Sequence, residues 1–138
     1  LSDGLLAQCG IDLDTHRGEI AAGNLSTLCD CPFVLGSAED IGGRIGRGLL
    51  RSSGVSPVSK ATSENVETLL ALCEQGVGAC FCPENLLHTA LSPAQLAHLH
   101  ILPLCPEASY PICFGYLSRS YPWSVLSEFI RIAREQAA

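Results

Sequence analysis

Short apolar runs alternate along the chain with stretches whose apolar residues recur at helical spacing. The run 31–35 contains an early Pro and ends at Gly36, which is typical of a strand buried on both faces. The segment 41–53 follows with isoleucine and leucine every four residues, and it predicts a helix that Gly54 ends. Four glycines weaken this helix, so tertiary packing has to hold it: Gly42, Gly43, Gly46 and Gly48.

The same alternation continues along the middle of the chain. Residues 55–61 form a second strand candidate, and 64–75 carry an apolar stripe at helical spacing. Gly76 stands where a left-handed residue ends a helix, and the apolar run 77–82 after it is a further strand candidate.

The two ends of the chain carry weaker patterns. We expect a strand at 5–9 and an exposed connection at 11–24. Downstream we expect a short helix or turn at 83–89, a helix opening at 92–95, strands at 99–104 and 111–117, and an amphipathic helix from Pro122. Strands that alternate with helices at this spacing predict an α/β fold with a mainly parallel sheet flanked by helices.

The composition indicates a folded domain and argues against some classes of binding partner. With 47% hydrophobic and 16% charged residues among 138, burial can offset the entropy cost of folding. The net charge of −6 argues against a nucleic-acid contact within these residues. No run of about 18 apolar residues predicts a membrane span, and no signal segment is recognisable. Because the sequence contains no Met, we expect a piece of a longer protein.

Eight cysteines are spread through apolar runs, where free thiols pack as small hydrophobic groups. This setting favours a reducing compartment over a disulfide scaffold. The pair Cys80 and Cys82 is a candidate redox site, as the less favoured alternative to simple thiol packing. The chain has no zinc-knuckle spacing, so no metal or other cofactor is expected.

Polar residues stand where two predicted helices begin, each after a predicted strand. Ser37 precedes the first helix, and Thr62, Ser63 and Asn65 lie at the opening of the second. Helix starts at the carboxyl ends of parallel strands present free N–H groups to ligands, so these four residues are candidate ligand contacts. The alternative is that they only cap helices, with Thr62 or Ser63 as the cap of the second. An anionic ligand is possible, although neighbouring glutamates would repel it unless they point away.

Catalysis has little support in the sequence. There is no nucleophile elbow, no phosphate-binding loop, and no Gly-x-Gly-x-x-Gly after a strand. A small cysteine-dependent hydrolase remains as an enzyme hypothesis without a motif. We therefore expect a protein that is not an enzyme.

The stretch from residue 25 to the end resembles the second half of the effector-binding domain of LysR-type transcriptional regulators. The first matching block is Leu25, Leu28, Pro32, Phe33, Val34 and Leu35. The strongest match is the block 64–84, in which a helix, Gly-x-Gly, an apolar strand and Pro follow in order. The resemblance implies a type 2 periplasmic-binding-protein-like lobe in which a small effector lodges in a cleft.

The resemblance also implies a domain layout and partners. Residues 1–119 would form the second lobe, and 120–138 an amphipathic helix that returns toward a largely absent first lobe. DNA would be contacted only by an N-terminal domain outside this sequence, within a cytoplasmic homo-oligomer that does not bind membranes. Two alternatives remain open, namely a lobe of a type 2 extracytoplasmic solute-binding protein and a thiol-based redox sensor of the same family.

Overall fold

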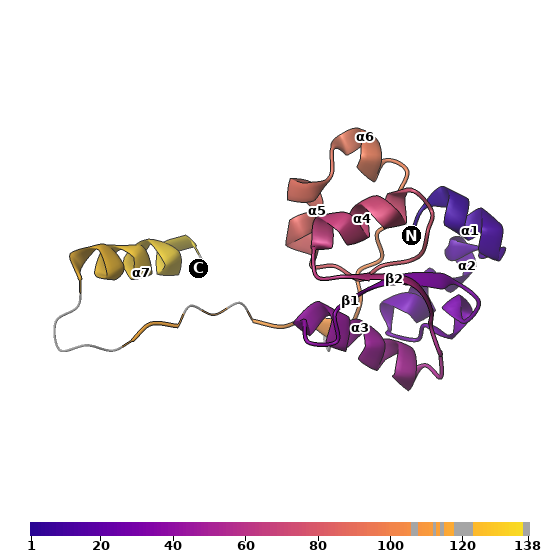
Figure 1. Ribbon diagram of the computed structural model, residues 1–138, viewed down its shortest axis with the longest axis horizontal. Helices are drawn as coiled ribbons and strands as arrows, with labels where there is room; N and C mark the ends of the chain where they lie inside the picture. The colour runs from indigo at the N-terminus through magenta and orange to yellow at the C-terminus, as the bar shows by residue number, and fades with distance from the viewer. Residues whose placement is uncertain (106–107, 112, 114, 118–122, 137–138) are drawn as a thin grey trace.

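The computed structural model describes residues 1–105, 108–111, 113, 115–117 and 123–136. Figure 1 shows helices packed around a small sheet, with one further helix standing apart from them. The elements in chain order are α1 (Asp3–Cys9), α2 (Leu13–Ala21), the 3₁₀ turn η1 (Ser26–Leu28), β1 (Pro32–Gly36), α3 (Ile41–Ser52), β2 (Val58–Ser63), α4 (Val66–Glu74), α5 (Glu84–Ala90), α6 (Pro93–Leu96) and α7 (Ser124–Gln136). Helices and parallel strands alternate through its middle, so the α/β prediction is confirmed.

The sheet consists of β1 and β2, paired in parallel. On the other edge of β1, Phe33 forms a parallel bridge with Ala79, whose N–H donates to the Pro32 carbonyl at 2.8 Å. The middle of β1 is fully buried, as its unbroken apolar run predicts. The exposed β2 forms the outer edge, where Val58 is 55% exposed.

The two faces of β1 are covered by different helices. Phe33 and Leu35 pack into the larger apolar cluster, which includes Leu50 of α3, whereas Val34 packs against Leu69 of α4. The chain moves outward from β1 to β2 and then returns across β1 to Ala79. Because parallel crossovers are right-handed, two connections in opposite directions place their helices on opposite faces. In Figure 1, α3 and α4 accordingly lie on either side of the strands.

The glycine-rich helix α3 packs on the sheet through its glycines. Its buried residues are Gly43, Gly46 and Leu50, while Ile41, the first residue of the apolar stripe, is 36% exposed. A Cβ at Gly43 would overlap the carbonyl oxygen of Ser37, and one at Gly46 would lie 2.5 Å from the Phe81 ring. The glycines therefore permit a close approach that larger residues would prevent.

Helix α4 has an asparagine at its start and a glycine after its end. The Asn65 side chain accepts a hydrogen bond from the Thr68 N–H at 3.0 Å. At the other end Gly76 has φ of 75°, a left-handed conformation that glycine adopts without steric cost. The predicted termination at this glycine is confirmed.

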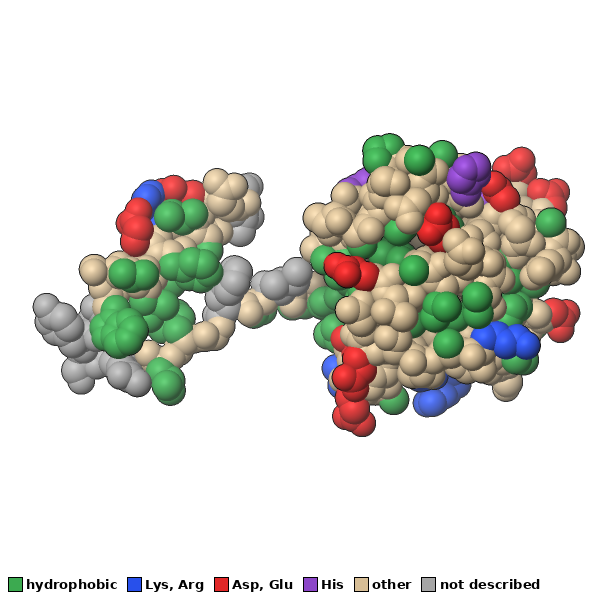
Figure 2. Space-filling model, turned by 45° about the horizontal axis from the view of Figure 1, so that its top comes forward, with side chains coloured by type: hydrophobic (Ala, Val, Ile, Leu, Met, Phe, Trp, Pro, Cys, Tyr) green, Lys and Arg blue, Asp and Glu red, His purple; other side chains and the backbone are tan. Residues whose placement is uncertain are grey.

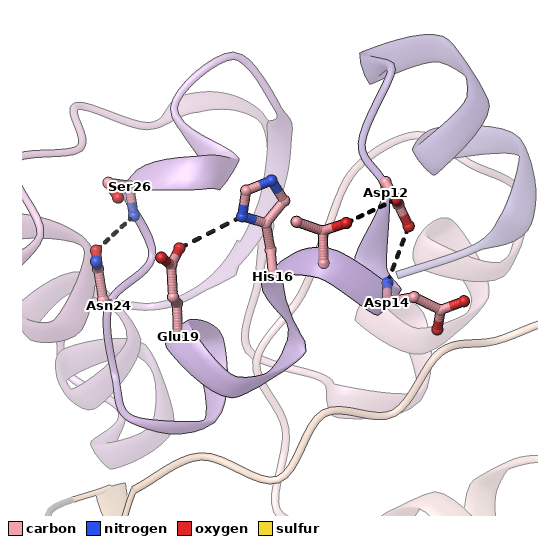
Figure 3. Close-up of polar contacts among 7 residues, drawn as sticks. Asp12, Asp14, His16, Glu19, Asn24 and Ser26 are labelled. Carbon is pink, nitrogen blue, oxygen red and sulfur yellow. Dashed lines mark hydrogen bonds and ion pairs between the residues drawn. The ribbon is translucent and has the colours of Figure 1, made fainter.

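The expected strand at 5–9 and the exposed connection at 11–24 are both wrong, because these segments form α1 and α2. Ser2 caps α1 by accepting from the Leu5 N–H, and Gly10 ends it with φ of 64°. Asp12 caps α2 by accepting from the Asp14 N–H at 3.0 Å (Figure 3). Cap residues that resemble turn signals explain both errors.

Figure 3 also shows the polar surface of α2 and the turn after it. The Thr15 hydroxyl donates to Asp12, and with the Asp14 N–H it lowers the pKa of that carboxyl. Farther along the helix, His16 lies 3.4 Å from Glu19. The hydrogen bonds of Asp12 stabilise the helix start as an N-cap does, whereas the exposed pair of His16 and Glu19 adds little to stability.

Three expected strands pair less than predicted. The run 77–82 forms only the bridge at Ala79, and 99–104 forms only an antiparallel bridge between Leu99 and Ser2. The strand bridged at Ser2 cannot extend, because α1 begins at the next residue. Of the expected strand 111–117, residues 112 and 114 lie outside the described residues, and the rest of that segment contains no strand where the structure describes it.

The two short helices after the sheet agree with their sequence signals. Residues 84–90 form α5, and Ser92 caps α6 in a complete capping box with Gln95. Together with Leu70 of α4, they enclose a small apolar cluster that includes Leu87 and Leu91.

The amphipathic helix α7 is present, although its expected first residue, Pro122, lies outside the described residues. None of its described side chains is buried. Val125 is 76% exposed and Ile132 46% exposed, and Figure 2 shows hydrophobic side chains gathered on this helix. Within the part of the chain that the structure describes, no helix is long and apolar enough to cross a membrane.

Candidate functional site

The carboxyl ends of β1 and β2 lie side by side. The parallel register pairs Gly36, the last residue of β1, with Ser63, the last residue of β2. The chain then turns into the start of α3 from one strand and the start of α4 from the other. The starts of two helices therefore lie at the carboxyl ends of the strands, which we call the carboxyl edge of the sheet. Each helix start carries unpaired N–H groups and a partial positive charge.

Ser37 lies at this edge, directly after β1. Its hydroxyl accepts a hydrogen bond from the Glu39 N–H at 3.2 Å. The cap of α3 is Asp40, whose carboxylate accepts from the Gly43 N–H at 3.1 Å. Ser37 thus stabilises the turn before the helix, and the partly exposed side chain stands beside the strand end.

The residues after β2 divide between turn and cap. Ser63 accepts a hydrogen bond from the Asn65 N–H at 3.1 Å, and Asn65 is the N-cap of α4. The expectation that Thr62 or Ser63 caps this helix is therefore wrong. Thr62 lies within β2, opposite Leu35, because the strand continues two residues beyond its expected end at Ala61.

The start of α4 borders a small open hollow of about 290 Å³. Asn65 lines this hollow together with Glu64 of the preceding turn, Glu67 of α4, and Leu86 and Thr89 of α5. Two carboxylates on the rim oppose an anion there, while the asparagine amide and the threonine hydroxyl can hydrogen-bond a neutral polar group.

Arg47 is a site residue that the sequence analysis missed. It lies on α3, and its Nη2 donates to the carbonyl oxygen of Gly36 at 2.8 Å. Its Nε is buried and has no hydrogen-bond partner among the described residues. The sequence signal that could have identified Arg47 is its place one turn after Gly43, on the buried side of a glycine-rich helix. It braces α3 against the end of β1 and brings positive charge to this edge.

A hollow larger than the one at the start of α4 lies elsewhere. It measures about 390 Å³ and is lined mainly by apolar side chains around Phe81 and the segment 99–105. None of Ser37, Thr62, Ser63 and Asn65 lines it. The sequence predicted that these polar residues gather at the carboxyl ends of the strands, but it did not predict this apolar hollow.

Cys80 and Cys82 are half-buried, and both pack against the apolar cluster of Leu70, Leu87 and Leu91. The cysteines are free thiols, and a redox role for this pair remains a prediction. Over the residues that the structure describes, no group of three His, Cys, Asp or Glu side chains is arranged to hold a metal ion.

Comparison with known proteins gives one family. No curated protein and no solved structure matches the chain. The family model described as the LysR substrate binding domain matches residues 16–138, which include the sheet, both helix starts and α7. Since this match covers most of the 138 residues, the chain belongs to the LysR substrate binding domain family.

Proposed function

We propose that this chain is the small-molecule-sensing part of a LysR-type transcriptional regulator, and that its effector binds at the carboxyl ends of β1 and β2. The observation that carries the proposal is the register between Gly36 and Ser63, which holds two helix starts together in a chain of this family. DNA would be contacted by another domain of the regulator, in the cytoplasm and as a homo-oligomer.

The chemistry of this edge defines what the effector offers. The helix starts supply N–H donors, Ser37 and Ser63 supply hydroxyls, and Asn65 supplies an amide. Glu64 and Glu67 oppose a full negative charge near α4, whereas Arg47 of α3 brings positive charge to the end of β1. We therefore propose a small polar effector whose acceptor groups face α3 and whose neutral end faces α4.

The lobe boundaries belong to the same proposal. Residues 1–119 would form the second lobe of a two-lobed domain, and 120–138 would return toward the first lobe. The exposed apolar side chains of α7 support this layout, since an amphipathic helix is stabilised by covering its apolar face. An effector that touches both lobes would favour the closed arrangement and so bias the oligomer.

The test is a ligand screen on the chain by amide NMR, with small carboxylates, sugars and amino acids as probes. A binder should shift the amide signals of residues 37–41 and 63–67 more than those of α6. Shifts confined to the segment 99–105 would place the ligand in the apolar hollow and contradict the proposed site. A full panel without any binder to this lobe would contradict it as well.

Variants at Asn65 separate ligand contact from helix capping. Asn65→Asp keeps the cap, because Asp caps as well as Asn, but it removes the amide donor and adds charge. We expect it to weaken binding about fivefold to tenfold, the effect of one lost hydrogen bond, with little change in stability. The matched control is Ser92→Ala, which removes the α6 cap and should leave affinity unchanged. Equal affinities for both variants would contradict a contact at Asn65.

A further inference from the structure

Three cysteine side chains lie next to one another in adjoining apolar clusters beside the sheet. Cys73 lies at the end of α4, and Cys80 and Cys82 lie in the segment that follows the bridge at Ala79. Cys73 and Cys80 share one apolar cluster, and Cys80 and Cys82 share the next.

The pKa values of these three thiols are shifted in different directions. The bond with Cys80, together with burial, raises the pKa of Cys73. Cys80 receives the bond from Cys73, which lowers its pKa, but the bond to Cys82 and burial prevail and raise that pKa to about 12. The bond from Cys80 lowers the pKa of Cys82, despite partial burial. The negative charge of a thiolate is therefore best stabilised on Cys82.

The same thiols line the apolar hollow of about 390 Å³. Around them the wall consists mainly of carbon, including Leu70, Leu87, Leu99 and Leu102. A hollow of this size admits a small organic molecule, and its lining favours an apolar one. Apolar compounds partition from water into such a hollow, so their local concentration beside the thiol is higher than in solution.

We propose that Cys82 is a modification site for small apolar α,β-unsaturated carbonyl compounds, which bind in this hollow and are added to its sulfur. The thiolate attacks the β-carbon, and a C–S bond forms as the carbon–carbon π bond breaks. The electron pair of that π bond moves toward the carbonyl oxygen and gives an enolate. Water then protonates the α-carbon, and the carbonyl group forms again. The sum is addition of one thiol across one double bond, which needs no oxidant. The proposal is independent of the effector site at the strand ends.

The test measures alkylation of each cysteine by peptide mass spectrometry, with N-phenylmaleimide as the apolar probe and iodoacetamide as the small polar one. At pH 7 we expect Cys82 to react with N-phenylmaleimide about tenfold faster than Cys29, which is exposed. The preference should be smaller with iodoacetamide, because that probe gains little from an apolar hollow. Faster labelling of Cys29 by both probes would overturn the proposal without any variant.

Two substitutions at Cys80 test the role of its hydrogen bond. Cys80→Ala removes the donor, so the pH midpoint of Cys82 alkylation should rise and its rate at pH 7 should fall. Cys80→Ser retains an O–H donor and should restore most of the rate. The control is Cys9→Ala, which removes a thiol outside the group of Cys73, Cys80 and Cys82. It should change neither the pH midpoint nor the rate of Cys82 alkylation. An unchanged midpoint in both Cys80 variants, in protein of native circular dichroism, would also overturn the proposal.

Discussion

Helices α3 and α7 make opposite use of their sequences. α3 contains four glycines, which disfavour helix formation, yet it packs closely on the sheet and buries Leu50 completely. α7 has good helix formers and a strong apolar stripe, yet none of its described side chains is buried. It is further supported by ion pairs from Arg131 to Glu128 and Glu135 along its own surface.

The difference shows that helix propensity and packing are separate properties. A helix that reaches a sheet through glycines gains dispersion contacts and apolar burial, which offset its poor propensity. A helix with good propensity gains no tertiary stability until a surface covers its apolar face. Substitutions in these two helices should therefore have unequal effects on the unfolding of the domain.

The largest contrast is expected for apolar truncations. Leu50→Ala should lower the free energy of unfolding by about 3 kcal/mol, because it removes a side chain with no exposed surface and leaves a cavity. Ile132→Ala removes as many carbons from α7 but should cost less than about 0.5 kcal/mol, since that side chain is 46% exposed. Urea unfolding followed by circular dichroism measures both. Equal losses would mean that α7 is packed as firmly as α3.

The next contrast lies within α3 itself. Gly43→Ala should cost about 2 kcal/mol, because its Cβ would overlap the Ser37 backbone and force the helix away from β1. Gly48→Ala should instead stabilise the protein by about 0.5 to 1 kcal/mol, since nothing lies within 4 Å of its Cβ and alanine favours a helix. Thermal and urea unfolding of the two variants provide the check. A stabilising Gly43→Ala would show that α3 does not depend on close approach.

A smaller effect is expected at the cap of α3. Asp40→Ala removes the acceptor of the Gly43 N–H and should cost about 1 kcal/mol. Asp40→Asn retains an oxygen acceptor and serves as the control, with a cost near zero. The comparison is made by urea unfolding at pH 7. If both variants lose the same amount, the charge of Asp40 and not its hydrogen bond stabilises the helix start.

The smallest effect at neutral pH concerns a buried thiol, and it grows in alkali. Burial and a hydrogen bond with Cys9 raise the pKa of Cys31 from 9.0 to about 12. The unfolded chain therefore loses this proton first, so stability is intact below pH 9 and falls as the pH rises from 9 toward 12. Cys31→Ala should flatten this fall, whereas Cys29→Ala, at an exposed thiol, should not. Unfolding free energies measured at several pH values decide this.

Much of the fold could be predicted from local pattern. The buried strand β1, the parallel α/β order, and the ends of α3 and α4 follow from apolar runs and from glycines at positions that need a left-handed residue. The buried face of α3 could not be predicted, since a search for apolar spacing selects Ile41 and overlooks Gly43. Strand pairing at 77–82 and 99–104 also failed, because it depends on what lies alongside and not on the segment itself.

The candidate site divides in the same way. The polar residues at the helix starts were found from their place after predicted strands, and the parallel register brings those starts to one edge. Which of them caps was misassigned, because a shift of two residues in the end of β2 moves the cap from Ser63 to Asn65. Arg47 and the thiol neighbour Cys73 were missed, since each acts on residues seven or more positions away.

By itself the sequence determined the buried strand β1, the alternation of strands and helices around it, and the glycines that end α3 and α4, because these signals act within a few residues of one another. Tertiary structure alone decided which helix lies on which face of β1, that glycines and not isoleucines face the sheet, and that three separated thiols meet beside an apolar hollow. These outcomes depend on close packing between distant segments, where a single methyl group decides whether two surfaces fit.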